Sequence, residues 1–222
     1  MKRLLCSSIG LLITASILQA QTIAQWTFET SVPTTAGPFA PEVGSGSASG
    51  SHVGATAYSN PVGNGSVESF SSTLWAVGDY WLFEVSTLGY NNVGLSWDQA
   101  SSSTGPRDFN LDYSLNSGST WTTVGSTYTV LLNGTPNVAW TSSSYNPAFT
   151  FSPALAGAVD NQASVWFRLI DVSTISANGG AVATTGTDRV DNFTVAVIPE
   201  PTSLSLLGGF GLLAWTLIRR RK

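Results

Sequence analysis

Four oxygen-bearing side chains could together hold a calcium ion. Asp188, Asp191 and Asn192 fall in one short segment that leads from a loop into a strand, and Glu29 ends the first predicted strand. Oxygen ligands of this kind are the ones that hard cations prefer. The four residues are therefore a predicted calcium site. The alternative is that Asp191 and Asn192 cap a turn while Asp188 pairs with Arg189.

Tryptophan is the second residue type that could form a binding site. The tryptophans between residues 21 and 198 are Trp26, Trp75, Trp81, Trp97, Trp121, Trp140 and Trp166. An exposed indole ring can stack on a sugar ring, whereas a buried one fills a core. Trp121 and Trp140 lie next to turns, so both are predicted to be exposed carbohydrate-binding residues. Packing in the core or at a sheet edge is the alternative for each.

Residues that could catalyse a reaction are few. A Ser-His-Asp site would have to use His52, the only histidine, which lies in a Gly/Ser-rich loop and is expected to be solvated. Zinc lacks ligands, because the chain has one histidine and, in Cys6, one cysteine. Asp108 and Asp112 could form a glycosidase pair, although such residues in β-proteins mostly lie on solvated faces. We predict no catalytic residues and a protein that is not an enzyme; a glycan hydrolase is the least favoured alternative.

The charge balance limits the partners. Residues 21–198 contain three arginines and twelve acidic residues, so this part of the chain has a formal charge of −9. The remaining positive charge lies almost entirely at the two ends. Nucleic-acid binding needs a basic surface, so nucleic acid is excluded as a partner. No cofactor other than calcium is predicted.

Strands must position these side chains, because short alternating runs dominate the middle of the chain and long amphipathic helices are absent from it. The predicted strands are 23–29, 80–86, 93–99, 109–115, 120–124, 128–132, 164–172 and 189–197. In the clearest of them, 109–115, alternation places Leu115 on the apolar face. Many short strands separated by turns predict an all-β fold, a single antiparallel β-sandwich over 21–198.

The first 20 residues have the pattern of a secretory signal peptide. Lys2 and Arg3 form the positive region, an apolar region follows over 4–18, and small residues supply a cleavage site. Cleavage is predicted after Ala20, with cleavage after Ala24 as the alternative. The body would then begin at about residue 21 and contain no cysteine.

The segment 199–222 has three blocks in a fixed order. A Pro-Glu-Pro tripeptide comes first, an uncharged apolar run follows over 203–218, and a basic cluster ends the chain at 219–222. Sixteen helical residues span roughly 24 Å, so the run is a short transmembrane helix. Basic residues stay on the cytoplasmic side, which predicts a body outside the cytoplasm.

This order resembles the PEP-CTERM sorting tail of exported bacterial proteins. The resemblance implies that an exosortase, a membrane-embedded cysteine transpeptidase, recognises the tail and cuts near the tripeptide. The predicted sorting residues are Pro199, Glu200, Pro201, Arg219, Arg220 and Arg221. A plain membrane anchor is the alternative.

A second resemblance concerns the body. The segment 79–124, with Leu95-Ser96-Trp97-Asp98-Gln99 and Leu111-Asp112-Tyr113-Ser114, and the closing segment 188–193 look like jelly-roll-like domains of exported bacterial surface proteins. The resemblance implies a jelly-roll-like sandwich and brings no catalytic residues with it.

The two ends of the chain predict an exported cell-surface or extracellular-matrix protein. The resemblance to PEP-CTERM proteins, which are associated with exopolysaccharide production, implies a structural or adhesive role in an exopolysaccharide matrix. The expected partners are the exosortase, membrane lipid around the tail, and extracellular polysaccharide. The protein would first be inserted in the inner membrane and then reach the cell surface or the medium. The alternative is a carbohydrate-binding module that uses exposed tryptophans, together with structural calcium.

Overall fold

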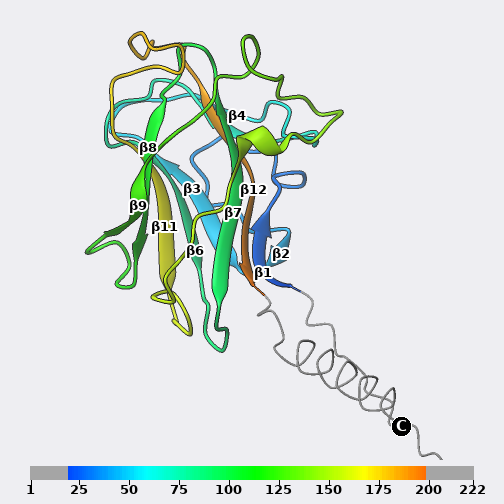
Figure 1. The fold of residues 1–222 in the computed structure, drawn as a ribbon, viewed down its shortest axis with the longest axis vertical. Coiled ribbons are helices and arrows are strands. Elements are labelled where there is room, and N and C mark those ends of the chain that lie inside the picture. Colours follow the sequence, from blue (N-terminus) through cyan, green and yellow to red (C-terminus); the bar gives the residue numbers. More distant parts are fainter. Residues whose placement is uncertain (1–19, 199–222) are drawn as a thin grey trace, which may run out of the picture. The chain divides into compact units, whose positions relative to one another are not determined.

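Two antiparallel β-sheets pack face to face in the computed structural model, which describes residues 20–198 (Figure 1). Sheet A contains β1 (Gln21–Trp26), β2 (Val43–Gly44), β4 (Tyr58–Ser59), β5 (Phe70–Ser72), β7 (Val93–Ser101), β10 (Thr150–Phe151) and β12 (Asp188–Val197). Sheet B contains β3 (Gly46–Ser51), β6 (Tyr80–Val85), β8 (Asp108–Ser114), β9 (Thr122–Thr129) and β11 (Val165–Asp171). A single 3-10 turn, η1 (Pro147–Phe149), is the one helical element of the described residues. The predicted all-β antiparallel sandwich is confirmed.

Strand β12 lies at the centre of sheet A, between β7 on one side and β1 and β5 on the other. Its pairing with β7 is interrupted by a bulge between Asp191 and Thr194, where Asn192 has a φ of 52°. Because a bulge inserts an extra residue, Val190 and Phe193 both face the core although they are three positions apart.

Strand β11 lies at the centre of sheet B, between β6 and β8. Its side chains alternate as expected for a strand with one covered face. The buried ones are Val165, Phe167, Leu169 and Asp171. The partly exposed ones are Trp166, Arg168 and Ile170. One face of sheet B therefore packs on sheet A, and the other is open to solvent.

Aromatic rings form the contact between the sheets. Phe83 of sheet B stacks on Phe193 of sheet A with ring centroids 3.5 Å apart and planes 2° apart. Trp26 approaches both rings edge-on, at 5.4 and 5.9 Å. All three side chains are fully buried. Burying a phenylalanine stabilises a fold by roughly 1.5–3 kcal/mol, so this cluster is a main source of cohesion.

The ends of β1 and β12 lie side by side, since Gln21 pairs with Val197. We call this end of the sandwich the tail end, because residue 198 follows it. The loops 102–107, 130–146 and 172–187 lie at the opposite end, which we call the loop end (Figure 1).

Two details of the strand prediction are wrong. The separate strands predicted at 120–124 and 128–132 are largely one strand, β9, which continues through the glycine at position 125. Leu115, predicted on the apolar face, is 43% exposed because β8 ends at Ser114 and the chain turns before residue 115 is covered.

The predicted signal peptide and the predicted sorting tail lie outside the described residues, apart from Ala20. The same holds for the six predicted sorting residues. Between residues 20 and 198, no helix has the length and apolar character needed to cross a membrane. The predicted boundaries 1–20, 21–198 and 199–222 stay predictions.

Substitution of Phe193 should test the contact between the sheets. Phe193→Ala removes a ring that packs against both sheets, and we expect the free energy of unfolding to fall by about 3–5 kcal/mol. Urea unfolding followed by fluorescence measures the loss. Val53→Ala, at a site 84% exposed, is the control and should change it by less than about 0.5 kcal/mol. Equal effects of the two substitutions would contradict this account of the core.

Candidate functional site

The outer face of sheet B carries three partly exposed aromatic side chains, Tyr80, Trp121 and Trp166. Cross-strand register places its side chains in rows. The row nearest the tail end is Ser47, Glu84, Trp166 and Ser114. The next row is Ser49, Leu82, Arg168, Asp112 and Thr123. The third row is Ser51, Tyr80, Ile170 and Asn110. Directly opposed side chains in such rows have Cβ atoms about 4.5–5.5 Å apart, so each row is a continuous contact surface.

Arg168 is fixed at the centre of this face. Its guanidinium lies 2.8 Å from Oδ2 of Asp112, and the Thr123 hydroxyl donates to Oδ1 of the same carboxylate at 2.7 Å. The cation lies 4.1 Å from the ring centroid of Trp121 and 5.6 Å from that of Tyr80. Cation–π contact and the ion pair therefore hold the half-exposed Trp121 ring over the sheet.

Trp166 borders a groove of about 290 Å³ at the tail end of the same face. The residues that line it are Ser45, Gly46, Ser47, Glu84, Val85, Ser86, Ala163, Ser164 and Trp166. Burial raises the pKa of the Glu84 carboxyl above its ordinary value, and a hydrogen bond from Ser47 partly opposes this shift. The groove thus joins an indole ring, a carboxyl group and several hydroxyls.

Trp140 does not belong to this face, and its predicted exposure is wrong. The residue is 3% exposed, and its indole nitrogen donates to the Val62 carbonyl at 2.6 Å. Its ring packs against Phe149 and Ala100 in a small second core. The loop that carries Trp140 folds over the outer side of sheet A, so nearness to turns did not imply exposure.

Asp188, a predicted calcium ligand, points into the space between the sheets. Its Oδ1 accepts from Trp81 Nε1 at 2.6 Å and from Gln99 Nε2 at 3.0 Å. Its Oδ2 lies 3.0 Å from the Ser101 hydroxyl, which also lies 2.6 Å from the Pro106 carbonyl. A hydroxyl has one proton to donate, so a protonated carboxyl at Asp188 would complete this network. Burial raises the pKa of Asp188 to about 7.

The other predicted calcium ligands lie elsewhere. Asp191 Oδ2 accepts from Asn64 N and Ser66 Oγ on the outer side of sheet A, so Asp188 and Asp191 face opposite sides of that sheet. The Asn192 amide donates to Asp98 at 2.8 Å, and Glu29 accepts from the backbone N–H of Glu68. Across residues 20–198, no group of three or more His, Cys, Asp or Glu side chains is placed to hold a metal. The four do not form one site in this arrangement.

His52 is buried rather than solvated, contrary to expectation. Its side chain is 1% exposed and packs edge-on against the Trp75 ring at 4.6 Å. Nδ1 lies 3.0 Å from Oδ2 of Asp79, and Nε2 lies 3.0 Å from the Ser72 hydroxyl. Burial lowers the pKa of His52 despite the Asp79 carboxylate.

Ser72, His52 and Asp79 are in contact in the order of a Ser-His-Asp nucleophilic triad. The sequence analysis did not identify this arrangement. A substrate must reach the serine oxygen, however, and Ser72 has no exposed surface. Asp79 also accepts backbone N–H groups from Val53 and Ala76 at 2.7 Å, which ties two loop segments together. We interpret the cluster as a structural hydrogen-bond network.

The proposed glycosidase pair is engaged in ion pairs. Asp108 accepts from Arg107 at 2.8 Å, and Asp112 accepts from Arg168. The guanidinium of Arg107 holds the pKa of Asp108 below its ordinary value. A general acid needs a raised pKa instead, so neither the pairing nor the charge state suits glycoside hydrolysis.

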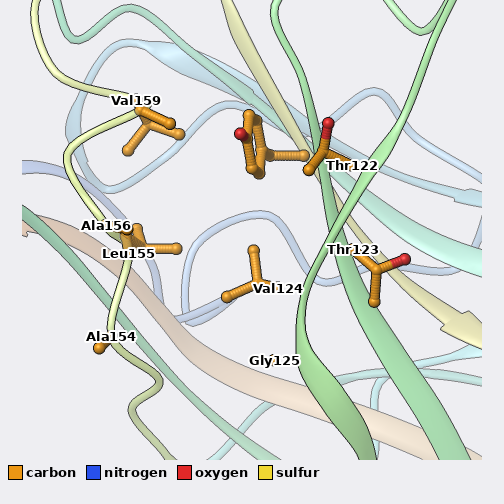
Figure 2. Close-up of a pocket in the computed structure, with 10 residues that line it drawn as sticks. Thr122, Thr123, Val124, Gly125, Ala154, Leu155, Ala156 and Val159 are labelled. Atoms are coloured by element: carbon orange, nitrogen blue, oxygen red, sulfur yellow. The ribbon is translucent and has the colours of Figure 1, made fainter.

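A second pocket, of about 240 Å³, opens between β9 and the segment 154–159. Figure 2 shows Val124 and Leu155 on its opposite walls, with the hydroxyls of Thr122 and Thr123 to one side. No titratable group other than the Tyr113 phenol lines it, so it offers little for chemistry.

Comparison with known protein families identifies a sorting motif at the C-terminal end of the sequence. Residues 197–222 match the PEP-CTERM protein-sorting motif, which confirms the sequence prediction. This motif implies an exported surface protein that an exosortase processes at the membrane. No curated protein sequence matches the chain.

Several solved structures resemble the body weakly. The K2 cleaved adhesin domain of Lys-gingipain is 14% identical, with 77% of this chain and 96% of that domain covered and a TM-score of 0.45. The K1 adhesin domain of Lys-gingipain from Porphyromonas gingivalis W83 is 11% identical, with 65% and 84% covered and a TM-score of 0.39. The enzymatically active domain of tailspike protein 4 from bacteriophage CBA120 is 14% identical, with 68% and 19% covered and a TM-score of 0.35. Likeness at this level carries no argument about function.

Substitution of Asp188 should change how stability depends on pH. The folded-state pKa of about 7 lies above the ordinary 3.8, so ionisation of Asp188 destabilises the fold progressively as the pH rises between these values. Asp188→Asn cannot ionise. Its free energy of unfolding relative to the wild type should therefore rise over this window and stay constant above it. Urea unfolding across the pH range measures the difference, and a difference that does not vary with pH would contradict the prediction.

Proposed function

We propose that this chain is a structural or adhesive protein of an extracellular polysaccharide matrix, delivered there by exosortase sorting of the segment 199–222. The observation that carries the proposal is the sorting motif, which follows the last strand of a folded β-sandwich without a linker domain. The exosortase and the lipid around the tail are the proposed partners at the membrane, and polysaccharide is the proposed partner outside.

The geometry of the body supports a surface protein held at one end. Gln21 and Val197 are neighbours, so the chain enters and leaves the sandwich at the tail end. The strand that leads to the motif, β12, is hydrogen-bonded on both edges rather than lying at the edge of its sheet. A central strand resists being peeled away, which suits a body that carries load through its C-terminal connection.

The candidate catalytic groups favour this proposal over a hydrolase. Ser72 is fully buried, and Asp108 and Asp112 are both paired with arginines. Each candidate is therefore occupied by a structural contact, and we assign none of them a role in catalysis.

The sorting proposal predicts a change in the fate of the tail. Substituting Pro199, Glu200 and Pro201 together by alanine should leave the protein full length in the inner membrane, since the recognition element is lost. The unsubstituted protein should lose the tail and reach the surface. Intact mass and cell fractionation in the native host measure both properties.

Substitution of Thr202, Ser203 and Ser205 by alanine is the matched control, because it changes the adjacent residues and keeps the tripeptide. The control should be processed normally. Retention of the tail in the unsubstituted protein would show a plain anchor instead, and the link to the polysaccharide matrix would lose its main support.

A second candidate function, carbohydrate binding, is favoured by Trp121. The ring is half-exposed and is held over the sheet by Arg168, so a ligand need not order it. Calcium binding is not needed for this role.

Loss of the Trp121 ring should weaken binding of a polysaccharide severalfold, because one stacking surface is removed. Tryptophan fluorescence during titration with neutral polysaccharides measures the affinity of Trp121→Ala. Leu115→Ala, at an exposed position six residues earlier, is the control and should bind like the wild type. Unchanged affinity in Trp121→Ala would remove this residue from the site.

A further inference from the structure

We infer that the groove beside Trp166 is a binding subsite for neutral polysaccharide. The inference rests on the proposed carbohydrate-binding function and deepens it, since it identifies the residues and the class of sugar. Neither Trp166 nor Glu84 was singled out by sequence reasoning.

The cross-strand register brings together the two chemical features that a sugar requires. Trp166 lies directly opposite Glu84 on the outer face of sheet B. A pyranose ring has an apolar C–H face, which packs on an indole, and a rim of hydroxyls, which donate to a carboxylate. At a cross-strand spacing of about 4.5–5.5 Å, a single ring can contact both side chains.

Hydroxyl groups complete the lining. Ser47 and Ser86 flank Glu84, and Ser164 lies near Trp166. A serine hydroxyl both donates and accepts, so it can match a sugar hydroxyl in either role. Such a lining of one ring and several small polar groups differs from the second pocket, which is mainly aliphatic. A volume of about 290 Å³ lies near the lower bound for small-ligand sites, roughly 300 Å³, and suits a short stretch of a chain.

Glycine at position 118 leaves room for two aromatic rings close to the sheet. A Cβ at Gly118 would lie 3.1 Å from the Trp166 ring and 3.3 Å from the Trp121 ring. Both rings therefore flank the same bare position of the turn after β8. A polysaccharide that fills the groove can continue from Trp166 onto Trp121.

Charge selects a neutral ligand. Glu84 is the one charged side chain that lines the groove, and Arg168 beside it is neutralised by Asp112. The formal charge of −9 over residues 21–198 adds repulsion of polyanions at longer range. A polymer rich in uronate or sulfate would meet like charge both in the groove and on approach.

The test uses the full chain in a polyoxyethylene detergent, because a glycosidic detergent would itself present sugars. Calorimetric titrations with dextran, laminarin and galactomannan probe neutral polymers, and alginate probes an anionic one. Short oligosaccharides cut from the neutral polymer that binds probe the groove alone. We expect at least one neutral polymer to bind and alginate to bind more weakly.

Two substitutions separate the groove from the neighbouring ring. Trp166→Ala should weaken binding of both the polymer and its oligosaccharides about tenfold, the effect of losing one aromatic contact. Trp121→Ala should weaken binding of the polymer and leave the oligosaccharides unaffected. Glu84→Gln, which keeps the side-chain volume, should reduce the preference for the neutral polymer over alginate.

A third variant tests the groove without removing the packing contacts that Trp166→Ala would lose. Ser45→Gln places a larger side chain at an exposed position of the groove and removes no core contact, and it should also weaken oligosaccharide binding. Near-ultraviolet circular dichroism checks that each variant is folded.

Three results would overturn the inference. They are wild-type oligosaccharide affinity in Trp166→Ala and Ser45→Gln, equal affinity for alginate, and failure of every neutral polymer to bind. If Trp121→Ala alone abolishes binding of polymer and oligosaccharide, the groove is excluded while carbohydrate binding by this protein stands. The sorting of the tail is measured separately and does not depend on any of these outcomes.

Discussion

The bulge in β12 determines which side chains face the core and which face outward, and much of the rest of the body follows from it. Without the extra residue, Val190 and Phe193 would lie on opposite sides of the sheet, and Phe193 could not stack on Phe83. Before the bulge the strand alternates regularly, so Asp188 lies between the sheets and Asp191, three residues later, faces outward. Asn192 adopts the left-handed conformation that the bulge needs, which asparagine tolerates better than most residues. Asn192, predicted as a calcium ligand, thus lies at the point where the strand register shifts.

The aromatic core has a second consequence, because indole nitrogens must find acceptors when they are buried. Trp81 donates to Asp188, Trp75 to the Ser72 carbonyl, and Trp140 to the Val62 carbonyl. Asp188 is buried as the acceptor for an indole, and Asp79 is buried as the acceptor for the backbone N–H groups of Val53 and Ala76. Buried acidic residues, a type that can suggest catalysis when only the sequence is known, here stabilise a body that contains no cysteine cross-links. Their burial is what makes them poor candidates for chemistry.

The sequence predicts the sandwich because period-two alternation is strong in β6, β8 and β11, and alternation reports directly which side of a strand is covered. The prediction of burial from alternation fails where a side chain is covered by segments that are distant in the sequence. Trp140 and His52 lie in loops of polar composition, yet one loop folds over sheet A and the other packs against Trp75. The outer face of sheet B could be predicted in part, because alternation in 164–172 places Trp166 and Arg168 on the side opposite the apolar residues. The pairing of Trp166 with Glu84 depends on strand register, which one sequence does not specify.

The position of the groove bears on how the protein would act in a matrix. Trp166 and Glu84 lie near the ends of their strands, close to the turn that leads from Val85 to Val93, and Val93 pairs with Val197 at the tail end. On the inference above, polysaccharide would therefore be held near the point at which the body joins its sorting segment, and not at the loop end. A contact there carries force over a short path, from the ligand through sheet B, across the Phe83–Phe193 stack and into β12. Such a path favours a protein that binds the matrix close to its own C-terminal segment over one that binds a distant surface through its loop end.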